Sequence, residues 1–403
     1  MKLERVCLCI IVRDEAQNLP RLWASLKGLY DYAVVVDTGS TDDTPTVARL
    51  LFNQRTTVHE TAWTDFGTAR SLSLAIARDN YAPDWFLILD ADETLEGPAG
   101  WEWPEVEDDV VAVLLRGRYE DGDVSWVRHH LLRANKPWEY RGVLHEYARY
   151  AGDDGPDAGK ALLTNEPWVL CHGDGIRTRS AKDRTEKFER DYEVLRREVQ
   201  AHPDEPRNWF YLGQACKDAG RWQEALMAFS RRDEFGDGGE EHYMTCFMAG
   251  IILAEHRDTT GEAGEWWLYK ALRMRPQRAE PLVGLAALWR ERKRYGEAYI
   301  AAQRAVWMAR PETELFYMSE HFWNWGREDE LSVCAFKVGK LSEGIEMTEA
   351  LIARGDVPEE HKTRMRKNLS EGYRAKEAKN GRARDHGDVR HQPDDGPALG
   401  ADS

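Results

Sequence analysis

The chain has 403 residues, a mass of 46.3 kDa and a formal net charge of −16, with six cysteines that include no CxxC pair. This length allows two or three domains, each with its own hydrophobic core. The acidic balance argues against nucleic acid or an anionic membrane surface as the main partner, and the cysteine pattern indicates a cytoplasmic protein without a disulfide framework or zinc site.

Strand and helix patterns alternate along the first part of the chain. The apolar run Val6–Val12 is far shorter than the roughly 20 residues that cross a bilayer, so it predicts a buried first strand and not a membrane span. Further strands are predicted at 33–37 and 85–89, and helices near 22–29, 44–52 and 67–77. Such alternation is typical of an α/β domain.

Two of these strands end in acidic residues. Asp37 and Asp90 both stand at the carboxyl end of a strand, where open α/β sheets bind ligands, so one crevice can hold both. Asp90 and Asp92 are two positions apart on an extended chain and therefore point the same way. Two such carboxylates can hold one hard cation, Mg²⁺ or Mn²⁺, which keeps sites for phosphate oxygens. A solvated turn after a buried strand would have the same residues.

Strand patterns continue to residue 171 and then give way to helices. A strand at 110–115, a hairpin over 118–132 and a strand at 168–171 complete the first domain. Residues 208–229 place Trp209, Gly213, Gly220 and Ala225 at the spacing of a tetratricopeptide repeat, and residues 281–306 repeat the pattern. A degenerate copy fits between them. A further helical pair at 329–351 and a capping helix at 357–369 follow.

The stretch LILDADET at 87–94 has a second interpretation. It matches the first motif of haloacid-dehalogenase-like phosphatases, four apolar residues followed by DxDxT, in which Asp90 would be the phosphoryl-accepting nucleophile. That motif normally ends the first strand of its domain, whereas here two strand–helix units precede it. This argues against the phosphatase without excluding it.

Six motifs occur in the order, and at about the spacing, found in inverting GT-A glycosyltransferases of family 2. They are LCIIVRDEAQNLPRLWASL, VVVDTGSTDDT, WTDFGTARSLSLAIA, WFLILDADE, YRGVLHE and LCHGDG. The chain most resembles the branch of that family that carries tetratricopeptide repeats after the catalytic domain. The resemblance covers most of residues 5 to about 370.

The resemblance implies roles for residues that match the family motifs. Asp37 would contact the nucleotide base or ribose, Arg70 would lie by the nucleotide, and Asp90 and Asp92 would bind the metal–diphosphate. The sequence departs from the pattern at 13–15, where RDE replaces a usual Asn-Glu, and at the residue after Arg70, where a serine replaces an asparagine. These departures concern individual contacts and not the class of enzyme.

Other site residues come from the second half of the transferase domain. In the family pattern Glu146 of LHE occupies the position of the catalytic base, and His172 follows the last strand as an additional metal ligand. Arg177 and Arg179 lie on a predicted loop and helix start, where they can close over the diphosphate. They would form a local cationic site on an acidic protein.

We therefore expect an α/β GT-A (nucleotide-diphospho-sugar transferase) domain followed by an all-α tetratricopeptide-type solenoid. The expected divisions are the transferase domain at 1–178, a linking helix at 179–204, helical repeats at 205–375 and a disordered tail at 376–403. The tail has almost no large apolar residues, so it cannot repay the entropy of ordering.

The resemblance implies an inverting, hexosyltransferase-like enzyme that uses Mn²⁺ or Mg²⁺ and a nucleotide-sugar donor, a UDP-sugar. Repeats of this kind form concave surfaces suited to peptides, so we expect a protein or peptide acceptor, while a glycan or lipid-linked acceptor stays open. Two alternatives also stay open. One is the phosphatase with Asp90 as nucleophile, and the other is an inactive transferase domain on a binding scaffold.

Overall fold

Two compact units make up the chain. The computed structural model describes residues 3–52, 55–120, 122, 124–150, 159–175, 181–257, 262–311 and 318–385, without the side chains of 181–185 and 380–385. One unit comprises Met1–Thr259 and Pro311–Glu320, and the other comprises Thr260–Arg310 and His321–Ser403. Within the described residues, no helix combines the length and the apolar character needed to cross a bilayer.

The first unit begins with a mixed β-sheet. Its strands are β1 (Val6–Val12), β2 (Tyr32–Asp37), β3 (Thr56–Glu60), β4 (Trp85–Ile88), β5 (Glu93–Glu96), β6 (Val110–Tyr119), β7 (Val124–Arg133), β10 (Lys160–Cys171) and β11 (Met318–Ser319). The strand order is β3-β2-β1-β4-β7-β6-β10-β5, and β11 pairs with β7. Strands β1 to β4 are parallel, and the direction reverses at β7. A separate hairpin joins β8 (Trp138–Arg141) and β9 (Tyr147–Tyr150).

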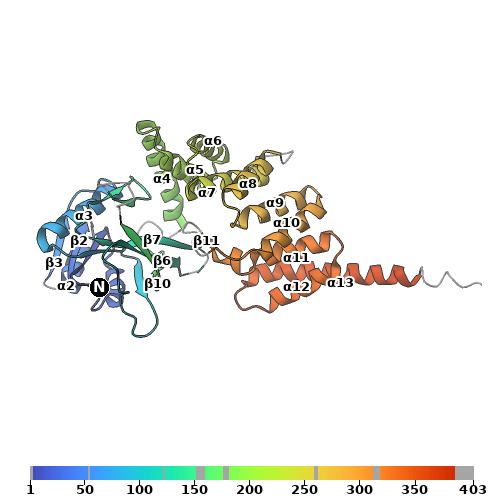
Figure 1. Cartoon of the computed structure of the whole chain (residues 1–403), viewed down its shortest axis with the longest axis horizontal. Helices are drawn as coiled ribbons and strands as arrows, with labels where there is room; N and C mark the ends of the chain where they lie inside the picture. Colours follow the sequence, from blue (N-terminus) through green and yellow to red (C-terminus); the bar gives the residue numbers. More distant parts are fainter. Residues whose placement is uncertain are drawn as a thin grey trace, which may run out of the picture. The chain divides into compact units, whose positions relative to one another are not determined.

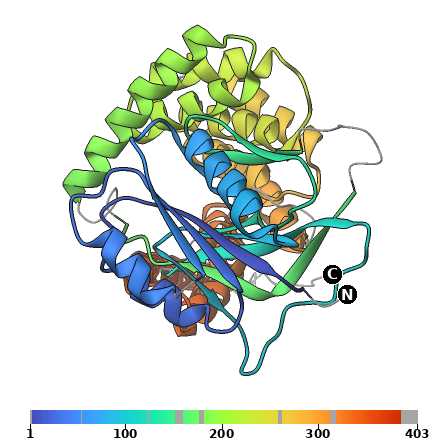
Figure 2. The same ribbon diagram turned by 90° about the vertical axis from the view of Figure 1, so that its left-hand side faces the viewer.

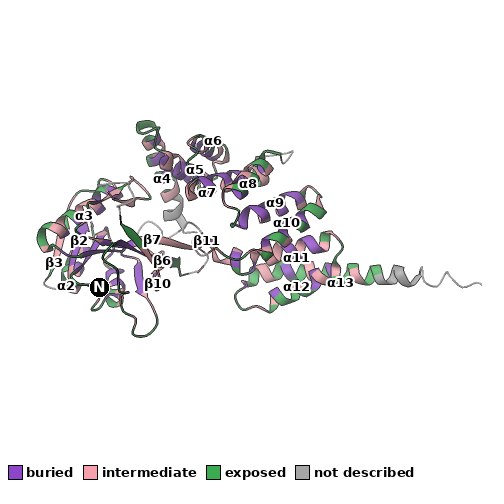
Figure 3. Ribbon diagram, in the orientation of Figure 1, coloured by how far each residue is buried: buried purple, intermediate pink, exposed green. Residues whose placement is uncertain are grey.

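Helices cover both faces of the sheet, as Figures 1 and 2 show. Side chains of β1 alternate between the two faces: Leu8 packs in one core with Leu22 of α1 (Leu19–Ser25), which α2 (Thr44–Leu51) adjoins. Cys9 packs in the other core with Leu74 of α3 (Phe66–Tyr81). The sheet therefore lies between two helical layers, and its central strands are buried (Figure 3). The α/β prediction is confirmed.

Helix α3 is longer than the predicted 67–77. The Asp65 side chain accepts a hydrogen bond from the Thr68 backbone N–H at 2.8 Å, which caps the first turn. Ala82 adopts a left-handed conformation with φ of 43°, which ends the helix. The predicted strand at 168–171 is also only the last part of β10, which pairs with β6 on one side and β5 on the other.

Helical pairs follow the sheet. The first unit contains α4 (Ala181–Ala201), α5 (Pro206–Asp218), α6 (Trp222–Asp233), α7 (Glu240–Ile252) and the π-helical turn η1 (Leu253–Arg257). Helices α5 and α6 approach so closely at Gly213 that a Cβ there would lie 2.3 Å from the Phe229 ring. This is the close helix contact that the repeat pattern predicts at Gly213.

The second unit is helical throughout its described residues. It contains α8 (Glu262–Met274), α9 (Glu280–Glu291), α10 (Tyr295–Trp307), η2 (Phe322–Gly326), α11 (Arg327–Lys337), α12 (Leu341–Ala353) and α13 (Glu359–Asp385). A Cβ on Gly344 of α12 would lie 2.9 Å from the Phe336 ring of α11, so this pair also meets at a glycine. The all-α repeat prediction is confirmed. Helix α13 continues past Lys376 to Asp385, and residues 386–403 lie outside the described residues.

Candidate active site

The carboxylate of Asp90 lies just past the end of β4 and is held between two arginines. Arg70, on α3, donates from Nη2 to Asp90 Oδ1. Arg128, on β7, lies 3.4 Å from Asp90 Oδ2 and donates to Glu93 Oε1 at 2.6 Å. Burial raises the pKa of Asp90, but the charges of Arg70 and Arg128 outweigh burial and hold that pKa well below its usual range. Asp90 is therefore ionised.

Arg70 links Asp90 to Glu146. The Nε–H of Arg70 donates to Glu146 Oε1 at 2.6 Å, and the Arg70 side chain is only 5% exposed. Burial opposes the charge of Arg70, but Asp90 and Glu146 raise its pKa well above the usual value. The remaining amino group, Nη1, is buried without a hydrogen-bond partner among the described residues. Asp90 and Glu146 thus contact the same buried guanidinium, that of Arg70. The Nη1 group of this guanidinium has no partner among the described residues.

Asp92 lies in an excess of negative charge. Burial and the charges of Asp90, Glu93 and Glu15 raise the pKa of Asp92 to about 7. A Cβ on Gly175 would lie 3.0 Å from Asp92 Oδ2 and 3.5 Å from Glu15 Oε1, so glycine leaves the space beside these oxygens open. Crowded carboxylate oxygens are the donor set that a hard divalent cation prefers, and such a cation would relieve their repulsion. Asp92 and Glu15 can therefore offer oxygens to such a cation, whereas both Asp90 oxygens contact arginines, so the metal site stays a prediction.

His172 supports Asp92 through the backbone. Its N–H donates to the Asp92 carbonyl at 3.0 Å. Its ring nitrogen Nε2 lies 3.1 Å from Thr94 Oγ1, and Nδ1 lies 3.2 Å from Glu120 Oε2. Both ring nitrogens therefore have partners, and direct coordination of a metal would require one of them to be released. The role of His172 as a metal ligand stays a prediction.

Asp37 ends β2 with one carboxylate oxygen unused. Its Oδ1 accepts from the N–H groups of Gly39 at 2.9 Å and Ser40 at 2.8 Å. Its Oδ2 is buried without a hydrogen-bond partner among the described residues. Because β2 and β4 both run parallel to β1, the carboxyl ends that carry Asp37 and Asp90 lie at the same edge of the sheet. Arg177 and Arg179 lie outside the described residues.

Three residues of this site were not predicted from the sequence. Arg128 and Glu93 complete the charge network around Asp90, and His130 is fully buried on β7. The His130 Nδ1 lies 2.8 Å from the Ile88 carbonyl oxygen, and burial with the charge of Arg128 lowers its pKa to about 3, so the ring is neutral. The position of Glu93 directly after the acidic motif was the available signal. Nothing in the sequence marks Arg128, because its place depends on how β7 pairs with β4.

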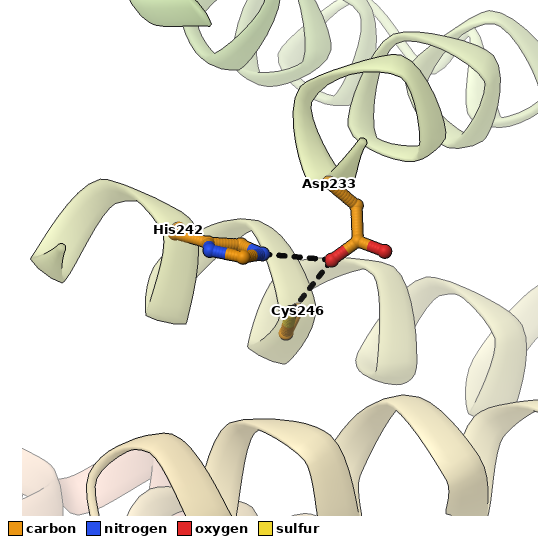
Figure 4. Close-up of side chains that lie close together, drawn as sticks. All are labelled: Asp233, His242 and Cys246. Carbon is orange, nitrogen blue, oxygen red and sulfur yellow. Dashed lines mark hydrogen bonds and ion pairs between the residues drawn. The ribbon is translucent and has the colours of Figure 1, made fainter. Parts of the chain in front are cut away.

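A second polar cluster lies between α6 and α7. Among the described residues, Asp233, His242 and Cys246 form the one group of three metal-binding side chains close enough for a single ion (Figure 4). His242 Nε2 lies 2.7 Å from Asp233 Oδ1, and Cys246 Sγ donates to the same oxygen at 3.6 Å. The Gly238 N–H donates to His242 Nδ1 at 3.1 Å, so a neutral ring carries its proton on Nε2, facing Asp233. The cluster is thus joined by hydrogen bonds, and we interpret it as structural.

Several known proteins resemble parts of this chain. Residues 7–158 match the family model described as glycosyl transferase family 2. A TPR repeat-containing protein of Synechococcus elongatus is 30% identical over 328 residues, which cover 75% of each chain. An uncharacterized glycosyltransferase of Rickettsia felis is 32% identical over 93 residues, 23% of this chain and 30% of that protein. A solved tetratricopeptide repeat protein of Parabacteroides merdae is 14% identical, with a TM-score of 0.37 over 49% of this chain and 70% of that one.

The family match covers the region that contains the acidic motif, and the match to the Synechococcus protein extends over most of the chain. Asp37, Asp90 and Glu146 all lie inside the matched region. The family match favours the transferase over the phosphatase interpretation. The chain therefore combines a glycosyl transferase family 2 domain with a region of tetratricopeptide-type helices.

Proposed function

We propose that this glycosyltransferase transfers a sugar from a UDP-sugar to an acceptor with inversion, and that it depends on Mn²⁺ or Mg²⁺. The observation that supports the proposal most directly is the bridge formed by Arg70, which contacts Asp90 and Glu146 at once. A donor-binding carboxylate and a base that removes the acceptor proton must lie on either side of the reacting carbon. One rigid guanidinium can set that distance.

The donor would bind along the sheet edge. The unused Oδ2 of Asp37 can accept a hydrogen bond from the base or ribose, and the unused Nη1 of Arg70 can donate to a phosphate oxygen. Asp92 would hold the divalent ion together with the Asp90 oxygen that Arg128 would have to release, and the ion would supply positive charge to the leaving diphosphate as a Lewis acid. The raised pKa of Asp92 means that binding of a cation competes with a proton near neutral pH.

Glu146 would act as the catalytic base. Its side chain is 12% exposed, and Arg70 Nε fixes one of its oxygens at 2.6 Å, which leaves the other oxygen to take the acceptor proton. A positioned base contributes roughly 10²- to 10⁴-fold in rate. Direct attack of the acceptor on the face opposite the leaving diphosphate inverts the anomeric carbon. The helical repeats make a protein or peptide our preferred acceptor.

The decisive experiment measures UDP release from a panel of UDP-sugars with Mn²⁺, with and without candidate acceptor proteins followed by intact mass. We expect turnover by the wild type and a loss of about 10²- to 10⁴-fold in Glu146→Gln, with donor affinity retained. Glu139→Gln is the matched control, because Glu139 is a partly exposed acid that pairs with Arg141 outside the network. UDP binding without turnover of any sugar would instead favour an inactive transferase on a binding scaffold.

A further inference from the structure

The loop that carries Glu146 is attached to the first helical repeat. We propose that Arg207 and Tyr211, on helix α5, are positioning residues for Glu146. The first repeat would then hold the catalytic base in place. This inference rests on the proposed function, because it assumes that Glu146 is the base. The transferase loop and the first repeat belong to the same compact unit.

Arg207 contacts the residues on both sides of Glu146. Its Nη2 donates to the His145 carbonyl at 3.1 Å, and its guanidinium lies 4.5 Å from the centre of the Tyr147 ring. The same Nη2 lies 3.1 Å from Tyr211 Oη, and Nη1 forms an ion pair with Glu241 of α7. A guanidinium held by an acid and two aromatic rings has one orientation, so it can fix the backbone that it contacts.

Tyr211 holds the residue before Glu146. The rings of His145 and Tyr211 are stacked, with centroids 4.0 Å apart and planes 6° apart. His145 has a φ of 52°, in the left-handed region that residues other than glycine rarely adopt. Such a conformation persists only when surrounding contacts hold it. The stack and the Arg207 hydrogen bond are two such contacts, and they act next to the carboxylate that faces Arg70.

The other end of the loop is fixed from α3. The Gly67 N–H donates to the Gly142 carbonyl at 3.2 Å, and a Cβ on Gly67 would lie 2.8 Å from that oxygen. An open cavity of about 570 Å³ is lined by the loop and by α4 and α5, including Leu144, Glu198 and Asn208. On this side the loop borders open space, so the contacts from α5 add to the β8–β9 pairing and the Arg70 hydrogen bond in holding its position.

The test compares full-length Arg207→Ala and Tyr211→Leu with Arg221→Ala. Arg221 is a matched control, because it also pairs with acids and lies 4.2 Å from the centre of a tyrosine ring, that of Tyr192, but does not contact the loop. With UDP-sugar as substrate, we expect kcat to fall at least about tenfold in the two test variants while KM for the donor changes less than about twofold. Tyr211→Phe, which keeps the stack, should restore most of kcat.

Hydrogen exchange of the loop supplies a readout that does not need turnover. We expect faster exchange at residues 142–147 in Arg207→Ala than in the wild type or Arg221→Ala, with exchange in the rest of α5 unchanged. Equal kcat in Arg207→Ala and Arg221→Ala, or unchanged exchange of the loop, overturns the inference. Absence of turnover in the wild type overturns the proposed function instead, and exchange still reports whether α5 holds the loop.

Discussion

Replacing Asp92 with asparagine should stabilise the metal-free protein, and more strongly at pH 8 than at pH 5. The pKa of Asp92 is raised from 3.8 to about 7, chiefly by burial and by the charge of Asp90. A carboxyl group whose pKa is raised on folding stabilises the folded state in its protonated form. That contribution is complete below the pKa of the unfolded chain and is lost as pH rises through about 7. Asparagine keeps the uncharged state at every pH.

The expected size follows from the shift in pKa. A difference of about three pKa units corresponds to about 4 kcal/mol, because one unit is about 1.4 kcal/mol. Partial exposure of Asp92 reduces this value, and part of the loss has already occurred at pH 5, so we expect the advantage of Asp92→Asn to grow by about 1 to 2 kcal/mol between pH 5 and pH 8. At about 2 to 4 °C per kcal/mol, the gap in Tm should widen by several degrees.

The assay is calorimetry of both proteins in chelator at the two pH values. Asp109→Asn is the control, because Asp109 is exposed and pairs with Lys160 away from the site. The Tm of Asp109→Asn should therefore not rise relative to that of the wild type between pH 5 and pH 8. Addition of Mn²⁺ at pH 8 should then raise the Tm of the wild type more than that of Asp92→Asn, since the cation replaces the proton. A Tm gap that stays constant from pH 5 to pH 8, or that reverses, would refute the account of Asp92 as a crowded carboxylate.

Three further variants test packing and charge. Arg128→Ala leaves the buried Glu93 carboxylate unpaired and should cost about 3 kcal/mol in urea unfolding at pH 7, with part of the loss recovered by adding Glu93→Gln; no recovery would contradict the pairing. Gly213→Ala places a methyl group against the facing ring and should cost about 1 to 3 kcal/mol in the same assay, unlike an alanine at the open position Gly296. His242→Gln should cost about 1 to 3 kcal/mol without changing turnover, and a loss of bound metal on this change would contradict a purely hydrogen-bonded cluster.

The sequence predicts the features that depend on local pattern. Continuous apolar runs identify β1 and β2, and Asp37 and Asp90 stand at the ends of their apolar runs, so both could be placed at the carboxyl ends of strands in one sheet. The repeat spacing of Gly213 likewise predicts a helix pair whose close contact the structure contains. These predictions succeed because each rests on residues within one element or its neighbour.

The missed features depend on contacts between distant segments. Arg128 reaches Asp90 only because β7 pairs antiparallel to β4, with Leu131 opposite Leu87, and no local signal specifies that register. The contact of Tyr211 with His145 depends on how a helical repeat docks beside a loop 66 positions earlier in the chain. The Asp37 oxygen that has no partner among the described residues also cannot be identified from the sequence, because it depends on which N–H groups donate to the other oxygen.

The attachment of Arg207 to the His145 carbonyl limits how this chain can be divided. A truncation after residue 178 would keep every motif of the transferase domain. It would remove the Arg207 side chain, which donates a hydrogen bond to the loop beside Glu146. A chimera that joins this transferase to the repeats of another protein would need an arginine and a tyrosine one helical turn apart at its first repeat. If the proposal holds, the first repeat must stay with the transferase domain in any division of the chain, as it does in the compact unit that contains both.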